Sequence, residues 1–355
     1  MSPERLRDEF GALLHQGCGV REFSLRAARI LRRAVPFEGV CVLTMDPATL
    51  VPTDEVVENG LPVPAYERMA EIELRGDDFN AFRSLALGDC RAATLSEATG
   101  GELDRSARHR QVRSPHGFGD ELRAALVDDG TTWGALTLQR GSDREPFAPQ
   151  AAALVGALSP HLAEGLRRAV LLADEAPAWP EHDDDAAGVV VLAADGSTAS
   201  ADDVAAAWLD ELGAAGSVPP VVAAVASHAR LAATGHARDG RIARARVRAR
   251  SGRWLVVRAS ALGNGPAPQV AVMIEPARPH ELAPLLADAY GLSDRERQVT
   301  ELVALGLSTD AIAARLYLSP WTVQDHLKAI FEKVGVATRG ELVARLFFRQ
   351  RAPRL

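Results

Sequence analysis

The sequence predicts a multidomain protein, in which two α+β units precede an all-α unit of four short helices. The chain has 355 residues, whereas compact domains commonly run to about 100–150 residues, so more than one domain is expected. Residues 174–187 and 277–288 are rich in proline, acidic and small residues and show no apolar period, which predicts two linkers. The expected domains are therefore residues 1–173, 188–276 and 289–355.

The first unit is predicted to start as a helix and to continue as a sheet. Phe23, Ala27, Ile30 and Leu31 have the spacing of one apolar helical face. The run VCVLTM, which begins at Val40, has the length and composition of a strand. Helix therefore gives way to strand near residue 40.

A hairpin and a long helix are predicted later in this unit. Asp129-Gly130 separates the runs DELRAALV and TTWGALTLQR, and an Asp-Gly step tolerates the positive φ of a tight turn. A helix is expected from about Pro146, because leucines recur every four residues on one face. This stripe is either core or a dimer seam, and consists of Leu154, Leu158, Leu162 and Leu166.

The GALTLQR strand, the PFAPQ segment and the leucine-striped helix together resemble the GAF family of small-molecule sensor domains. That resemblance implies a ligand pocket within residues 50–117, which is the least regularly patterned stretch of the unit. No ligand-binding residue can be carried over, because a shared fold does not fix a ligand.

The second unit is predicted as a strand, a helix and three closing strands. GVVVLAAD is the first strand, Asp195-Gly196 is a turn, and the following helix carries Val204, Trp208 and Leu212 inward. This order resembles a PAS domain. The segment ASAD at residues 199–202 lacks the asparagine common in that family, and no haem or flavin ligand stands out, so no cofactor is expected.

One of the closing strands carries a row of arginines. In RARVRAR at residues 244–250, arginines alternate with small apolar residues, and a period of two places all four on one face. The expected role is the solvated face of an edge or half-exposed strand. The alternative is a contact surface for nucleic acid or another protein.

From Leu292 onward, each helix has local start and stop signals. Ser293 and Glu296 form a capping box, and Gly306 suits the left-handed end of the same helix. Its predicted apolar stripe is Val299, Leu302, Val303 and Leu305. Ser308 or Thr309 begins the second helix, which turns Ile312, Ala313 and Leu316 inward.

The third helix is predicted from Pro320 to about Val334. Ser319 is its cap, and proline at the first helical position loses only an amide that has no partner there. Only Tyr317-Leu318 precedes this cap, so the second and third helices form a compact angled pair. The predicted buried face consists of Val323, Leu327, Ile330, Phe331 and Val334.

The opposite face of the third helix is rich in hydrogen-bonding groups. It presents Trp321, Gln324, Asp325, Lys328 and Glu332. A second capping box, Thr338 with Glu341, begins a fourth helix. The stripe of that fourth helix is Leu342, Val343, Leu346 and Phe347.

The motifs LSxRExxV, GxS, IAxxL, SxxTVxxH, KxGV and RxEL follow in register between residues 292 and 342, and together they resemble the LuxR-type helix-turn-helix domain. The resemblance implies that the third helix lies in the major groove of double-stranded DNA. Gln324, Asp325 and Lys328 would face bases, and adenine, cytosine and guanine are their respective matches.

The same resemblance places Thr322, His326 and Lys333 near the phosphate backbone, with Trp321 on the exposed face. Two of these have alternatives: His326 as a packing partner inside the helix pair, and Lys333 as an ordinary surface lysine. The distribution of charge along the chain agrees with a DNA-binding module at residues 292–355. The net charge is −7, but ten Lys and Arg face seven Asp and Glu from Leu292 onward, so a module of +3 is joined to a body of −10.

Several protein classes are disfavoured by the sequence. The cysteines, Cys18, Cys41 and Cys90, are scattered and odd in number, and neither CxxC nor HExxH spacing occurs, so no metal is expected. The sequence contains neither a GxxxxGK[ST] phosphate loop nor a nucleophile elbow, so an enzyme is not expected. No run is apolar enough for a membrane, and the amino terminus lacks a signal peptide, which favours the cytoplasm.

The resulting hypothesis is a cytoplasmic, homodimeric transcription regulator that binds specific DNA sequences under the control of amino-terminal sensor domains. Its expected partners are double-stranded DNA, an unidentified small-molecule ligand and RNA polymerase. The alternative is a DNA-binding tail fused to an enzymatic or protein-interaction module.

Overall fold

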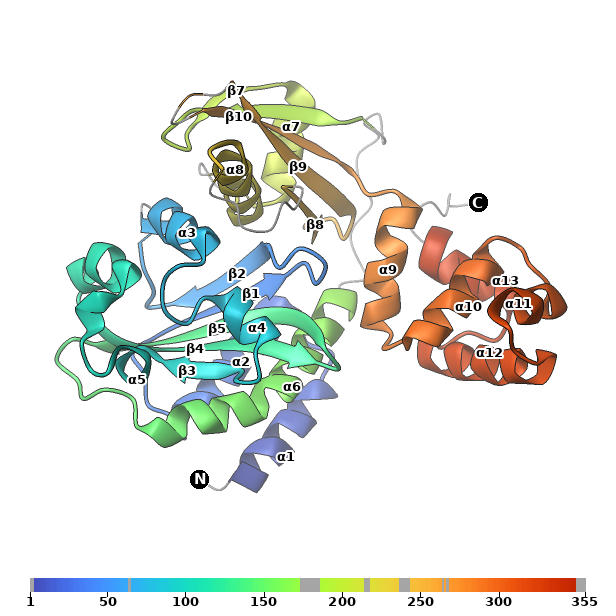
Figure 1. Cartoon of the computed structure of the whole chain (residues 1–355), viewed down its shortest axis with the longest axis horizontal. Coiled ribbons are helices and arrows are strands. Elements are labelled where there is room, and N and C mark those ends of the chain that lie inside the picture. Colours follow the sequence, from blue (N-terminus) through green and yellow to red (C-terminus); the bar gives the residue numbers. More distant parts are fainter. Residues whose placement is uncertain are drawn as a thin grey trace. The chain divides into compact units, whose positions relative to one another are not determined.

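The computed structural model describes residues 3–62, 65–172, 186–213, 218–235, 243–263, 265 and 268–348. The chain divides into two compact units, Met1–Pro276 and Ala277–Leu355. The first unit contains two five-stranded sheets, and the second contains only helices (Figure 1). The predicted linker at 174–187 lies outside the described residues except for its last two positions.

The first domain, residues 3–172, is built on an antiparallel sheet with the strand order β2-β1-β5-β4-β3. The strands are β1 Gly39–Met45, β2 Pro52–Glu58, β3 Ala92–Thr94, β4 Phe118–Asp128 and β5 Thr131–Gly141. The Asp-Gly hairpin is confirmed: Asp129 has φ 45° and Gly130 φ 75°, between the paired strands β4 and β5. Positive φ at both positions is what a two-residue turn needs to follow the sheet twist.

Helices cover both faces of this sheet. α1 Pro3–Leu14, α2 Val20–Arg32 and α6 Pro149–Leu172 lie on one face (Figure 1). The other face carries α3 Tyr66–Arg75, α4 Phe82–Leu87 and α5 Leu95–Thr99. In the predicted leucine stripe of α6, Leu158, Leu162 and Leu166 are buried against the sheet, so the core alternative is confirmed for them; Leu154 is half-buried.

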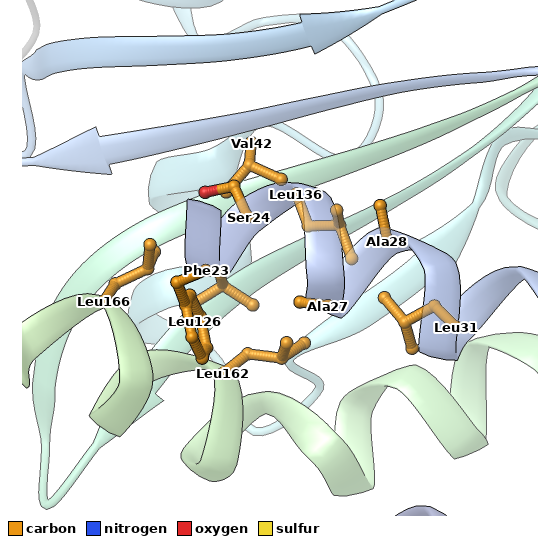
Figure 2. A pocket seen from close by; sticks show the side chains of 10 residues that line it. All are labelled: Phe23, Ser24, Ala27, Ala28, Leu31, Val42, Leu126, Leu136, Leu162 and Leu166. Carbon is orange, nitrogen blue, oxygen red and sulfur yellow. The ribbon is translucent and has the colours of Figure 1, made fainter. Parts of the chain in front are cut away.

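The packing between α2, α6 and the sheet leaves a cavity of only about 10 Å³ (Figure 2). Nine of its ten lining residues are apolar; Ser24 is the exception. Close helix contact depends on Gly165, because a Cβ there would lie 1.9 Å from Cζ of Phe23. A space of this size holds about one water molecule at most. This side of the sheet is therefore core rather than a ligand site.

The second domain, residues 186–276, is a second antiparallel sheet with the order β7-β6-β10-β9-β8. Its strands are β6 Gly188–Leu192, β7 Thr198–Ala201, β8 Arg244–Arg248, β9 Trp254–Leu262 and β10 Gln269–Pro276. The helices α7 Asp203–Glu211 and α8 Pro220–Ala233 complete it. When the strands of each domain are numbered along the chain, both sheets have the same order: second, first, fifth, fourth, third.

The arginine row is a solvated face only in part: β8 is an edge strand and Arg250 is exposed, but Arg244 and Arg248 are half-buried and Arg246 is buried. Arg246 is 5% exposed, and it bonds Asp46, at the end of β1, through its backbone N, Nε and Nη2 at 2.8, 2.9 and 2.6 Å. Arg248 donates to the carbonyl oxygen of Val170 at 2.8 Å. The solvated-face prediction was wrong for Arg246, because the edge strand β8 lies against the first domain, which also inserts Val51 into the apolar core of the second.

The carboxy-terminal unit begins with a helix where the sequence predicted a linker. Residues Pro279–Ala289 form α9, in which Leu282 and Leu285 are buried. The linker prediction at 277–288 was wrong because Pro279 occupies the first helical turn, where proline is tolerated, and the two leucines lie on one face. The remaining helices are α10 Asp294–Ala304, α11 Thr309–Leu316, α12 Pro320–Val334 and α13 Arg339–Val343, which continues as a π-helical turn, Ala344–Phe348.

Most of the predicted core of this unit is buried. Val299, Leu302 and Val303 of α10 pack with α11 and α12, but Leu305 is 71% exposed, so its assignment to the stripe was wrong. Leu305 is the residue that ends α10, where the chain turns away at Gly306. No helix of the described residues is long and apolar enough to span a membrane.

Candidate nucleic-acid interface

Local hydrogen bonds fix both ends of α12. Ser319 Oγ accepts a hydrogen bond from Thr322 N at 3.0 Å, and Pro320 occupies the first turn. Gly335, with φ 71°, ends the helix in the left-handed region. The predicted cap, first residue and last residue of the third helix are all confirmed, because each signal acts within four residues of its partner.

The turn between α11 and α12 sets the angle of the helix pair. Tyr317 ends α11 with φ 57°, a left-handed conformation that is uncommon for a residue with a side chain. Leu318 N then donates to the carbonyl oxygen of Ala313 at 2.9 Å. Ile312 and Val323, both fully buried, belong to the core that joins the two helices. Helix α12 is thus held by its apolar face, and its other face is left uncovered within this unit.

The uncovered face of α12 contains the predicted base-contacting residues. Gln324, Asp325 and Lys328 are exposed, and no hydrogen bond or ion pair joins their side chains to any other described residue. Trp321, near the start of the helix, is 71% exposed. Thr322 and His326 are half-buried beside them. A tryptophan and three polar side chains therefore project from one helix with their donors and acceptors unused.

Lys333 lies elsewhere and has partners inside the domain. Its Nζ donates to the carbonyl oxygen of Gly291 at 3.0 Å and to Oε2 of Glu296 at 2.7 Å. Glu296 is the acid of the α10 capping box, since its Oε2 also accepts from Ser293 N at 2.7 Å. Burial raises the pKa of Glu296, but hydrogen bonds from Lys333 and Ser293 outweigh burial and hold it below its ordinary value. Lys333 thus ties the end of α12 to the start of α10.

Two further contacts were not foreseen from the sequence. Arg339 donates to the carbonyl oxygen of Leu307 and to Oγ1 of Thr309, both at 2.8 Å, and so joins the starts of α13 and α11. The second capping box is only half formed: Thr338 accepts from Glu341 N, but the Glu341 carboxylate bonds Ala337 N instead of the cap amide. The RxEL motif drew attention to Arg339 and Glu341, but their hydrogen-bond partners are visible only in the structure.

Comparison with known proteins assigns the family of this unit. The family model "Bacterial regulatory proteins, luxR family" matches residues 291–346. The chain is 49% identical over 53 residues to the probable transcriptional regulatory protein NarL of Mycobacterium tuberculosis, covering 15% of this chain and 24% of that protein. It is 48% identical over 56 residues to the transcriptional regulatory protein UhpA of Escherichia coli K12, covering 16% and 29%. The chain thus spans about a quarter of the length of these relatives.

Similarity to the solved structures that match larger parts of the chain is low. A GAF domain/HD domain protein from Geobacter sulfurreducens is matched at 20% identity and a TM-score of 0.30, covering 41% of this chain and 90% of that one. Escherichia coli SdiA is matched at 12% identity and a TM-score of 0.31, covering 96% and 95%. Scores this low do not establish a shared fold. The family assignment therefore rests on the carboxy-terminal helices: residues 291–346 of this chain are a LuxR-family helix-turn-helix domain.

Proposed function

We propose that the chain is a sequence-specific transcription regulator that binds double-stranded DNA through α12. The single observation that supports this best is the exposed face of α12, where Gln324, Asp325 and Lys328 have no partner among the described residues. In a soluble domain, a helix whose apolar face is buried and whose polar face is free suits the major groove, where base edges offer both donors and acceptors.

Each side chain on this face suits a different base edge. Gln324 pairs in a bidentate manner with adenine, Lys328 donates to guanine, and Asp325 accepts from the cytosine amino group. Asp325 also discriminates: where no cytosine amino group faces it, its charge is repelled by the phosphates. Thr322, His326 and Trp321 are assigned to the flanking backbone, since they lie at the start and side of the helix.

Dimerisation is part of the proposal. One helix-turn-helix domain contacts few bases, and a twofold pair gains affinity and reads the spacing of two half-sites. The modest charge of +3 from Leu292 onward also favours pairing, because a weakly basic module attracts phosphate only locally. In this proposal, the regulator is cytoplasmic and not an enzyme, RNA polymerase is a partner, and the first two domains sense a small molecule and bias the pairing.

Selection of duplexes from a random pool with the purified full chain tests the proposal. The expected result is an enriched site with two related halves, bound more weakly as salt is raised. Sedimentation of the chain with and without that duplex then gives the stoichiometry. A pool that shows no enrichment would overturn DNA recognition, and a single chain on the enriched duplex would overturn pairing.

A further inference from the structure

Three arginine side chains are buried in the first domain, on the side of the sheet that α4 covers. Arg108, Arg113 and Arg123 are each 3% exposed or less. Arg123 lies on β4 and stacks over the ring of Phe82 in α4, 3.6 Å from its centroid. Arg108 and Arg113 come from the segment before β4, where a π-helical turn spans His109–Arg113. Such turns are rare and are frequently found at functional sites.

Two of these arginines are paired with acids and also donate to backbone carbonyls, although Nε of Arg123 has no hydrogen-bond partner in the described part of the chain. Arg108 donates through Nε to Oε1 of Glu121 at 2.8 Å, through Nη1 to Oδ2 of Asp78 at 3.2 Å, and to a backbone carbonyl. Arg123 binds Oε2 of Glu73 at 2.8 Å and a second backbone carbonyl. Their charges are balanced inside the fold, as buried charges require.

Arg113 is different. Its Nη1 is 3.0 Å from Oε2 of Glu121, a carboxylate that already serves Arg108, and no nitrogen of its guanidinium makes a hydrogen bond within the described residues. Its guanidinium also lies over the ring of Phe118, 5.6 Å from the centroid. A guanidinium has five donors, and unmet buried donors carry a desolvation cost. Nη1 of Arg113 thus faces Oε2 of Glu121, whereas Nε and Nη2 are left without an acceptor among the described residues.

An open depression lies beside the same helical turn. It is lined by residues 101–105 and His109, and its volume is about 610 Å³, within the range of about 300–1,000 Å³ typical of small-molecule sites. His109 is 6% exposed, and its Nδ1 is buried without a partner. His109 and Arg113 are the two ends of one helical turn, and burial lowers the pKa of His109 while the charge of Arg113 lowers it further.

We propose that this turn binds a small oxyanion, a carboxylate or phosphate group, which enters from the depression and pairs with the Arg113 guanidinium beside His109. The planar fork of arginine matches two oxygens of such a group. Asp104 at the rim is 82% exposed, so solvent screens its repulsion. Binding is independent of DNA; only its consequence for DNA affinity rests on the proposed function.

Calorimetric titration of the full chain with acetate, succinate and inorganic phosphate, with chloride added to equal ionic strength, tests the site. We expect at least one of these oxyanions to bind and to raise the melting temperature, whereas chloride does neither. Comparison of the three separates a carboxylate from a phosphate preference. If none of the oxyanions binds, the proposal is overturned.

Variants then locate the site. Arg113→Gln is expected to weaken binding at least about tenfold, since it loses the charged fork. Arg110→Gln is the matched control, because Arg110 lies on the same turn and is exposed. Arg113→Lys keeps the positive charge but loses the planar guanidinium, so it should bind the oxyanion with intermediate affinity. This variant tests the role of Arg113 if the glutamine variant does not fold. Equal binding by wild type and a folded Arg113 variant would overturn the assignment.

The affinity for the selected duplex, measured with and without the bound oxyanion, separates the two proposals. If the chain binds an oxyanion but no DNA, the oxyanion site remains supported and the proposed function is overturned. If the DNA affinity is the same with and without the oxyanion, both binding activities remain supported, but control of DNA binding by the oxyanion is overturned.

Discussion

In the first domain three arginines are buried among acidic side chains, whereas in the carboxy-terminal unit the polar residues of α12 are exposed and unpaired. The physical demands on the two sets differ. A buried charge must find its partner within the fold, because its water has been removed. An exposed side chain needs no partner for folding and is free to find one in another molecule. Changes in the first set should therefore alter stability, and changes in the second should alter binding.

The largest effect is expected for Glu121→Ala. It leaves Arg108 and Arg113 without their shared carboxylate in a buried site, which should lower the free energy of unfolding by about 3–5 kcal/mol. Urea unfolding of the full chain followed by circular dichroism measures this. Glu22→Ala is the control: Glu22 pairs with Arg26 on the surface, and such pairs contribute less than about 1 kcal/mol. Equal unfolding midpoints for the two variants would contradict the buried-charge interpretation.

The second largest effect is expected for Asp46→Ala, at about 3 kcal/mol, because it removes the carboxylate that accepts hydrogen bonds from the buried Arg246 at the contact between the first and second domains. Adding Arg246→Met removes the buried charge that Asp46 neutralises and should restore part of the lost stability. The free energy of unfolding and hydrogen exchange at β8 are the readouts. If the double variant is as unstable as the sum of the two single variants, the pair is not coupled.

Acid should act on the same buried cluster. Burial raises the pKa of Glu121, but Arg108, Arg113 and Arg123 outweigh burial and hold it at about 2, against 4.5 for a free glutamate. A carboxylate whose pKa is lowered by folding stabilises the fold above its unfolded pKa and loses that contribution as pH falls through the folded value. Stability should therefore fall between about pH 4.5 and 2. Glu121→Ala should flatten the fall, and an unchanged profile would exclude Glu121 as its source.

On α12, Lys328→Ala should weaken binding to the selected duplex by about 1–3 kcal/mol and relax base preference at one position. Its stability should be unchanged, since Lys328 has no partner within the described residues. Gel shifts on the selected duplex and on its single-base variants measure both effects. Unchanged affinity would remove Lys328 from the interface.

The smallest effect is expected for Lys333→Ala. Loss of the bonds to Gly291 and Glu296 should lower the stability of the carboxy-terminal unit by about 1 kcal/mol. DNA affinity, measured well below the melting temperature, should stay within about a factor of two of wild type if Lys333 acts only inside the domain. A uniform loss of affinity for all duplexes with unchanged stability would instead make Lys333 a phosphate contact.

The carboxy-terminal helices were predictable because their signals are local. The side chains of the caps Ser293, Ser308 and Ser319 each accept a hydrogen bond from the amide three residues ahead, so the local sequence alone marks the start of each helix. The hairpin at Asp129-Gly130 follows the same logic, since the conformation of two residues fixes the turn. The exposed face of α12 also follows from helical period once its apolar side is known.

The failures have an equally physical cause. Alternation in RARVRAR correctly places the arginines on one strand face, but no local pattern states that Asp46, 200 residues earlier, would lie against that face. Likewise, α9 was missed because its two prolines and polar start are typical of a linker. Only the folded structure shows that Leu282 and Leu285 are buried. The partner of a charge and the covering of an apolar face are properties of the folded chain.

The sequence by itself therefore determined where α10, α11, α12 and the β4–β5 turn begin and end, most of the apolar faces of α10 to α12, and the free polar face of α12, because all of these depend on residues a few positions apart. Only the tertiary structure decided which charges are buried, that Arg246 joins two domains, that Lys333 turns inward to Glu296, and that Arg113 is left short of acceptors. Those outcomes depend on how the sheets and helices pack, and desolvation makes the result costly to change.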